Sequence, residues 1–241
     1  MAAVSARYLS DMRDVLSGRR SVYYGWWVLA AGTIAMALGS GLSMSAFGLY
    51  VKPLEEEFGW DRAQVSLGFS CAVLASGLTA PLIGHWVDSR GARSAILIGS
   101  LLAALSYVLL ALTQTLWQYY VFYAFHALAR QMMFFLPFQA LMSQWFDRKR
   151  GVALSILGSG FSLGSFLVLP IVAVAIGGLG WRGAYLFSGA VVAAFFIPVS
   201  LLVIRNRPAD KGLLVDGDLE ERQDTSGVVV RPAASSGLTL R

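Results

Sequence analysis

Six long apolar runs constrain the fold of this chain more than any other feature. They cover residues 26–50, 63–86, 94–113, 117–142, 152–178 and 184–204. An apolar helix of about 20 residues crosses the hydrocarbon core of a bilayer. Lipid offers no hydrogen-bond partner, so each span must satisfy its backbone groups internally, which favours helices. We therefore expect an all-α, polytopic membrane protein with six transmembrane helices, whose first partner is the lipid bilayer.

Composition and charge agree with this fold class. Only 14% of the 241 residues are charged, against about 25% in soluble proteins. The net charge of +5 is not spread as a nucleic-acid surface would be. Lys and Arg gather near the N-terminus, at 88–93, at 147–151 and from Arg205 onward, and the only others are Lys52, Arg62, Arg130 and Arg182. By the positive-inside rule, this alternation predicts an integral protein of the plasma (inner) membrane with both termini cytoplasmic.

Three regions follow from these patterns. Residues 1–20 form a cytoplasmic N-terminal lead, and residues 21–204 form the transmembrane domain. Residues 205–241 are polar and contain Pro, Gly and Ser, which predicts a cytoplasmic linker or a disordered tail.

Two charged hairpins separate the spans on the basic side. The stretch 84–93 reads Gly-His-Trp-Val-Asp-Ser-Arg-Gly-Ala-Arg, and we interpret it as a tight ten-residue loop that begins where Gly84 ends a helix. Its key positions are Gly84, Asp88, Arg90, Gly91 and Arg93.

The second hairpin, 145–151, reads Trp-Phe-Asp-Arg-Lys-Arg-Gly and holds Asp147, Arg148 and Arg150. In the span that follows, Gly160 and Gly164 lie on one helical face and allow a neighbouring helix to approach closely.

Together these motifs resemble the N-terminal half of a major facilitator superfamily transporter. The 84–93 stretch resembles the signature between the second and third helices, although Ser89 and Ala92 stand where basic residues are usual. Its closer resemblance, over roughly 22–217, is to the monocarboxylate porter and oxalate:formate antiporter branch. The stretches that carry this are 58–63, 81–84, 145–153 and 205–214.

The resemblance implies a fold of two six-helix halves with the substrate between them. This chain would supply one half, and Asp88 would contact the other. The two hairpins would act as gating and structural motifs without touching substrate.

Arg130 is the strongest candidate for a substrate contact. It lies inside the fourth span, where a charged side chain is costly and commonly functional. His126 and Tyr123 share its helical face, and Ser43 is a weaker candidate in the first span. A guanidinium binds a carboxylate through two parallel hydrogen bonds. Two other roles stay open: Arg130 could pair with a backbone carbonyl or an acid of the second half, and His126 could support packing or couple protons.

We therefore predict a secondary transporter that moves small organic anions, such as monocarboxylates, by symport or antiport with alternating access. Spans one, four and five, which carry polar and small residues, are expected to line the path, and the all-apolar spans three and six to face lipid or structural neighbours. Other partners would be a second six-helix half or a second copy. The alternatives are a truncated or split-gene product inactive alone, and a homodimerising membrane scaffold.

Enzymatic and cofactor-dependent functions find little support. The stretch 160–164 matches G-x-S-x-G, yet it lies within an apolar helix instead of a strand-to-helix turn. No phosphate-binding glycine loop is present. Glu55, Glu56 and Glu57 fit solvated charges better than a metal site, so we expect no metal and no cofactor.

Overall fold

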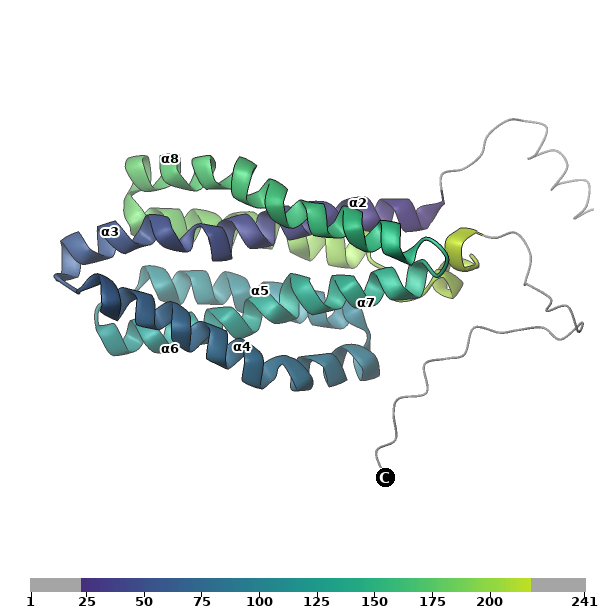
Figure 1. The fold of residues 1–241 in the computed structure, drawn as a ribbon, viewed down its shortest axis with the longest axis horizontal. Coiled ribbons are helices and arrows are strands. Elements are labelled where there is room, and N and C mark those ends of the chain that lie inside the picture. The colour runs from purple at the N-terminus through teal and green to yellow at the C-terminus, as the bar shows by residue number, and fades with distance from the viewer. Residues whose placement is uncertain (1–22, 218–241) are drawn as a thin grey trace, which may run out of the picture.

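The described part of the molecule consists of helices that run back and forth along one long axis (Figure 1). The computed structural model describes residues 23–217, so the predicted lead at 1–20 and positions 218–241 of the predicted tail lie outside it. Within the described range there is no strand.

The elements follow one another with short connections. They are α2 (Tyr24–Gly39), the π-helical turn η1 (Ser40–Ser45), α3 (Phe47–Phe58), α4 (Arg62–Arg90), α5 (Ala92–Ala111), α6 (Leu116–Arg130), the π-helical turn η2 (Gln131–Phe135), α7 (Leu136–Trp145), α8 (Arg150–Pro198), the π-helical turn η3 (Val199–Val203) and two 3-10 turns, η4 (Pro208–Lys211) and η5 (Val215–Gly217). Gly180, with φ 71° and ψ 170°, interrupts α8. There the chain turns back, and the second part of α8 returns along the bundle (Figure 1).

Four helical stretches in the described range are long and apolar enough to cross a membrane: Tyr24–Phe58, Arg62–Arg90, Ala92–Ala111 and Arg150–Val203. The count of six spans stays a prediction. It is supported by the reversal at Gly180, which divides the last stretch, and by the continuous helix from Leu116 to Trp145.

The two ends of the bundle differ in chemistry. At one end, the Tyr24 hydroxyl donates to the Val203 carbonyl (2.9 Å), and Trp145 Nε1 donates to the Arg205 carbonyl (3.0 Å). Arg90, Arg93, Arg148, Lys149, Arg150 and Arg205 all lie at this end, which we call the basic end. The opposite end, called the far end, holds the tips of α3, α5 and α6 and the Gly180 reversal.

The prediction of a ten-residue loop at 84–93 is wrong. Helix α4 continues to Arg90, so Gly84 and Asp88 lie within it, and Gly91 alone reverses the chain. Gly91 adopts φ 84°, a conformation that residues with a Cβ rarely adopt. Apolar periodicity ends at the membrane interface, whereas a helix continues through polar residues until a residue such as this glycine stops it.

The polar residues 52–58, which follow the first apolar run, are helical for the same reason. It belongs to α3, which ends where Gly59 adopts φ 67°. The polar residues of 205–217, assigned from sequence to a linker or tail, form η4 and η5 against the basic end.

Glycines bring the first part of α8 directly onto α2. A Cβ on Gly164 would lie 2.1 Å from the Ala37 carbonyl oxygen, and one on Gly160 would lie 2.4 Å from that of Thr33. The buried Ser40 hydroxyl donates across the same contact to the Phe161 carbonyl (3.0 Å). The backbones of these two helices are therefore in van der Waals contact, which only glycine permits at these positions.

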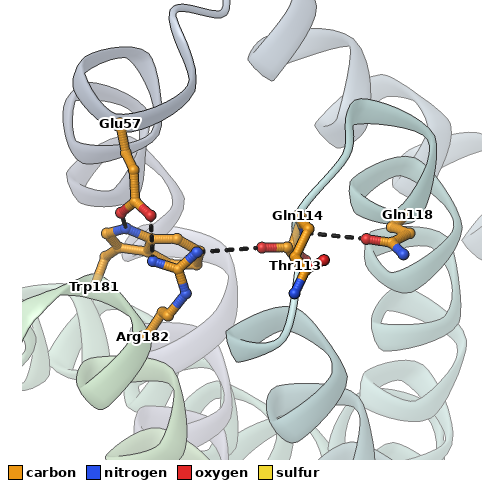
Figure 2. Close-up of polar contacts among 6 residues, drawn as sticks. All are labelled: Glu57, Thr113, Gln114, Gln118, Trp181 and Arg182. Carbon is orange, nitrogen blue, oxygen red and sulfur yellow. Dashed lines mark hydrogen bonds and ion pairs between the residues drawn. The ribbon is translucent and has the colours of Figure 1, made fainter.

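An ion-pair cluster ties three elements together at the far end (Figure 2). The Glu57 carboxylate accepts a hydrogen bond from Trp181 Nε1 (2.5 Å) and pairs with the Arg182 guanidinium. Arg182 Nη2 donates to the Thr113 carbonyl (3.5 Å), and its guanidinium lies 4.2 Å from the centroid of the Trp181 ring. The end of α3 is thus joined to the α5–α6 connection and to α8.

Replacing Glu57 with Gln should lower the thermal stability of the detergent-solubilised protein. The amide keeps the shape of the carboxylate but loses the charge that strengthens its hydrogen bonds, which we expect to cost about 1 kcal/mol because the pair is partly exposed. Glu56→Gln is the matched control. Glu56 pairs only with Lys52 across 3.6 Å on the surface of the same helix. Equal melting temperatures for the two variants would contradict a stabilising role for the Glu57 ion-pair cluster.

Gly164→Ala should destabilise the protein by about 1–3 kcal/mol, because the added methyl group overpacks the α2–α8 contact. Gly158→Ala is the control, since a Cβ at Gly158 meets nothing within 4 Å. Alanine at this helical position should be neutral or slightly stabilising. Thermal unfolding in the same micelle measures both variants, and a Gly164→Ala protein as stable as Gly158→Ala would refute the close contact.

Candidate functional site

Polar and aromatic side chains gather inside the bundle along one face of α6. Tyr119, Tyr123 and His126 are buried, and Arg130, the last residue of α6, is half-buried. Their spacing of three or four residues places them in one row, as the sequence indicates.

Neighbouring elements complete this cluster with aromatic rings that the sequence analysis did not select. The ring of Tyr107, from α5, lies 4.6 Å from that of His126. Tyr50, from α3, stacks on Tyr185, from the second part of α8, with centroids 3.9 Å apart. Spans three and six were expected to face lipid or structural neighbours, yet Tyr107 and Tyr185 are buried in this cluster.

Ser43 lies in η1 beside the same cluster. Its hydroxyl donates to the Gly39 carbonyl, and its side chain also interacts with Tyr107. The structure therefore brings all four predicted contacts, Ser43, Tyr123, His126 and Arg130, into one interior region. Tyr107 could have been selected from the sequence, because it and Ser106 are adjacent polar side chains within a largely apolar span.

A short hydrogen-bond chain fixes the orientation of His126. The Ser106 hydroxyl lies 2.7 Å from the Ala103 carbonyl and 2.8 Å from His126 Nδ1. A hydroxyl has one proton, and the carbonyl can only accept, so Ser106 donates to Ala103 and His126 Nδ1 donates to Ser106. In the neutral ring, Nε2 is then the acceptor.

Arg130 has no acidic partner among the described residues. Within residues 23–217, no acidic side chain forms an ion pair with it, and its electrostatic partners are Tyr107 and Tyr123. The buried hydroxyl of Tyr119 has no hydrogen-bond partner in the described part of the chain. Buried polar groups are normally satisfied, so this interior holds more donors than the described residues use.

Two π-helical turns adjoin the cluster. Turn η1 contains Ser43, and turn η2 begins directly after Arg130. The Phe134 ring of η2 packs where a Cβ on Gly39 would lie, only 2.6 Å away, so η2 contacts the end of α2 directly before η1. Such turns are frequent at functional sites because they alter the direction of side chains within a continuous helix.

An open cavity of about 530 Å³ lies nearer the basic end. Helix α4 contributes Gly84 and Asp88 to its wall, α7 contributes Gln139, and α8 contributes Arg150 and Gly158. Thus span two lines the cavity together with spans one, four and five. The predicted hairpin residues Gly84, Asp88 and Arg150 border it, whereas the Arg130 cluster does not.

The other hairpin residues stabilise the basic end. The Arg93 guanidinium donates to the Ser200 and Leu201 carbonyls, each at 2.9 Å, and the Arg90 guanidinium lies 4.1 Å from the centroid of the Trp86 ring. Asp147 and Arg148 are exposed in the α7–α8 connection. Across residues 23–217, no group of three or more His, Cys, Asp or Glu side chains could hold a metal ion.

Comparison with known proteins places these features in a family. An uncharacterised MFS-type transporter of Bacillus subtilis, YcxA, is 26% identical over 194 residues, covering 79% of this chain and 47% of that protein. Human monocarboxylate transporter 11 is 33% identical over 171 residues, or 69% of this chain and 36% of the transporter. The oxalate:formate antiporter of Oxalobacter formigenes is 20% identical over 206 residues, or 86% of this chain and 48% of the antiporter.

The chain spans half or less of the length of these relatives. Over residues 17–234 it matches the family model described as Major Facilitator Superfamily. Together with its apolar helices, this match shows that the chain is an integral membrane protein that belongs to the Major Facilitator Superfamily.

Proposed function

We propose that this chain is the N-terminal half of a secondary transporter that moves small organic anions by alternating access. The observation that carries the proposal is Arg130, a cation inside the bundle whose described surroundings are neutral tyrosine and histidine side chains. A charge in a membrane interior is costly unless it is paired or hydrated. An anionic substrate would supply the missing partner.

The cluster offers the donors that a carboxylate requires. Arg130 can donate two parallel hydrogen bonds, and the tyrosines that interact with it, Tyr107 and Tyr123, lie in the same cluster. Two relatives support this substrate class, since one is named a monocarboxylate transporter and another an oxalate:formate antiporter. The hydrogen bond between Ser106 and His126 Nδ1 favours a supporting role for His126. If His126 couples protons, the proton would bind at its other ring nitrogen, Nε2.

A second half should cover an apolar face of the molecule. Large side chains of α4 and of the first part of α8 are exposed, with Leu78 78% and Phe166 77% accessible. Both helices also line the open cavity. We propose that a second six-helix half packs there, with both termini on the cytoplasmic side as the basic end indicates. In a homodimer, a second copy of this chain would cover this face. In an inactive split product, lipid would cover it.

Arg130→Gln should weaken binding of a small carboxylate. Loss of a charged hydrogen bond costs about 1.5–3 kcal/mol, which corresponds to about 10–150-fold in Kd. Equilibrium binding of radiolabelled oxalate, formate and lactate to the purified chain measures the effect. Arg130→Lys should retain part of the affinity, because it keeps the charge but loses the two-pronged geometry.

Arg62→Gln is the control for this experiment, since Arg62 is exposed at the far end. Unchanged affinity in Arg130→Gln would refute the anion role. Binding that falls equally in the Arg62 variant would indicate attraction by overall charge only.

The half-transporter proposal predicts that the chain alone is monomeric in detergent and catalyses no uptake when reconstituted into liposomes. Light scattering coupled to size exclusion gives the mass of the protein component, and labelled oxalate or lactate reports uptake. A stable dimer that catalyses uptake would instead establish the homodimer and refute the need for a second half.

A further inference from the structure

The residues that follow η3 fold back across the basic end. Ile204 and Pro208 are buried there, and Pro208 begins the turn η4. Lys211 places its ammonium 4.7 Å from the centroid of the Tyr24 ring. The segment 204–217 is therefore packed onto the bundle at several points along its length.

One anchor of this segment is Asn206 at the α4–α5 hairpin. Its Oδ1 accepts a hydrogen bond from the Arg93 backbone N–H (2.9 Å). Its side chain also fills the space beside Gly91, where an added Cβ would lie 2.4 Å from Asn206 Nδ2. The residue that ends α4 and the first turn of α5 are thus both in contact with Asn206.

The second anchor is Asp216 at the α7–α8 connection. Its carboxylate accepts hydrogen bonds from the backbone N–H groups of Asp147 (3.2 Å), Arg148 (2.7 Å) and Lys149 (3.3 Å). These groups lead into the N-terminus of α8, where negative charge is favoured by the helix dipole. Asp216 holds φ 61°, a strained conformation for a residue with a Cβ that surrounding contacts must maintain.

The open cavity lies between the elements that these two anchors hold. Its α4 wall, with Gly84 and Asp88, ends at the hairpin bound by Asn206. Its opposite wall, with Ser143 and Arg150, flanks the connection bound by Asp216. Only nine residues, 207–215, lie between the anchors along the chain, and they include the turn η4.

We propose that residues 204–217 form a brace that sets the distance between the two walls of the cavity, with Asn206 and Asp216 as its positioning residues. Release of either anchor lets the α4–α5 hairpin and the α7–α8 connection separate, which widens the cavity at the basic end. This role is independent of the proposed substrate, because it depends only on the contacts between the brace and the two hairpins.

Distances between spin labels on the two walls test the brace in the full 241-residue chain. Cys71, the only cysteine, is first replaced by Ser. Labels are then attached at Ser89→Cys on α4 and Ser155→Cys on α8, both exposed positions whose hydroxyls bond only within their own helix. Pulsed electron paramagnetic resonance should give a longer and broader distance distribution after Asp216→Ala than in the parent.

Asp210→Ala is the matched control. Asp210 lies in the same segment but bonds only locally, to the Arg207 N–H (3.1 Å), so its loss should leave the distribution unchanged. Asn206→Ala should reproduce the lengthening. The double variant should add little to either single change, because release of one anchor already frees the brace.

A second label pair, at Glu56→Cys and Gln114→Cys on the far end, separates brace release from general loosening of the fold. The brace predicts an unchanged far-end distance in every variant. An unchanged distance between the walls in both Asp216→Ala and Asn206→Ala would overturn the proposal, as would equal broadening at both ends. Should Asp216→Ala not fold, Asp216→Asn, which keeps one acceptor oxygen, should give a smaller shift of the same sign.

Discussion

The arrangement of the bundle depends on the close backbone contact between α2 and the first part of α8. Gly160 and Gly164 allow this contact, and the Ser40 hydroxyl bridges it. Between transmembrane helices in lipid, packing and hydrogen bonds supply the association that the hydrophobic effect supplies in water. Once these helices are joined, η1 and the Ser43 side chain lie at a fixed depth beside the interior of α6. A side chain larger than hydrogen at Gly160 or Gly164 would push the two helices apart and displace η1 and Ser43 with them.

The interior cluster combines satisfied and unsatisfied polar groups in a way that suggests function. The chain Ala103–Ser106–His126 is complete, since each proton has an acceptor, and it joins α5 to α6. Arg130 and the Tyr119 hydroxyl, in contrast, have bonding capacity that no described residue uses. A purely structural network would be expected to satisfy its own members. Arg130 carries the positive charge of this cluster, which is why the ligand that we propose is an anion.

Much of the fold could be predicted from sequence because apolar runs and glycine spacing are local signals. The helical class, the basic hairpins and the contact face of Gly160 and Gly164 all derive from such patterns. Helix ends could not be located in this way. Hydropathy falls at the membrane interface, but α4 continues to Arg90 until the positive φ of Gly91 stops it. The backbone angle, not the polarity of the residues, sets the end.

The interactions that could not be predicted from sequence depend on contacts between distant segments. Glu57 resembles its neighbours Glu55 and Glu56 in sequence, and only the reversal at Gly180 brings Arg182 to it. Tyr107 lies in a span that appears featureless until α6 is packed against it. Asp216, within a polar segment typical of a linker, gains its role from backbone donors almost 70 residues away, at |i−j| of 67–69.

The π-helical turn η2 has a consequence for how the fourth span can change during evolution. Each residue of an α-helix advances side chains by about 100° around the axis, so one inserted residue that is absorbed as a π turn restores the register beyond it. Deletion of a single residue from 131–135 would turn η2 into ordinary helix and leave α7 in register with α6, so Gln139 and Ser143 would keep their place in the cavity wall. A deletion elsewhere in this span has no π turn to absorb it and would rotate the residues beyond it by about 100°. The π turn is therefore the place where the fourth span can lose a residue without displacing the cavity wall, although hydropathy alone would treat the span as one uniform helix.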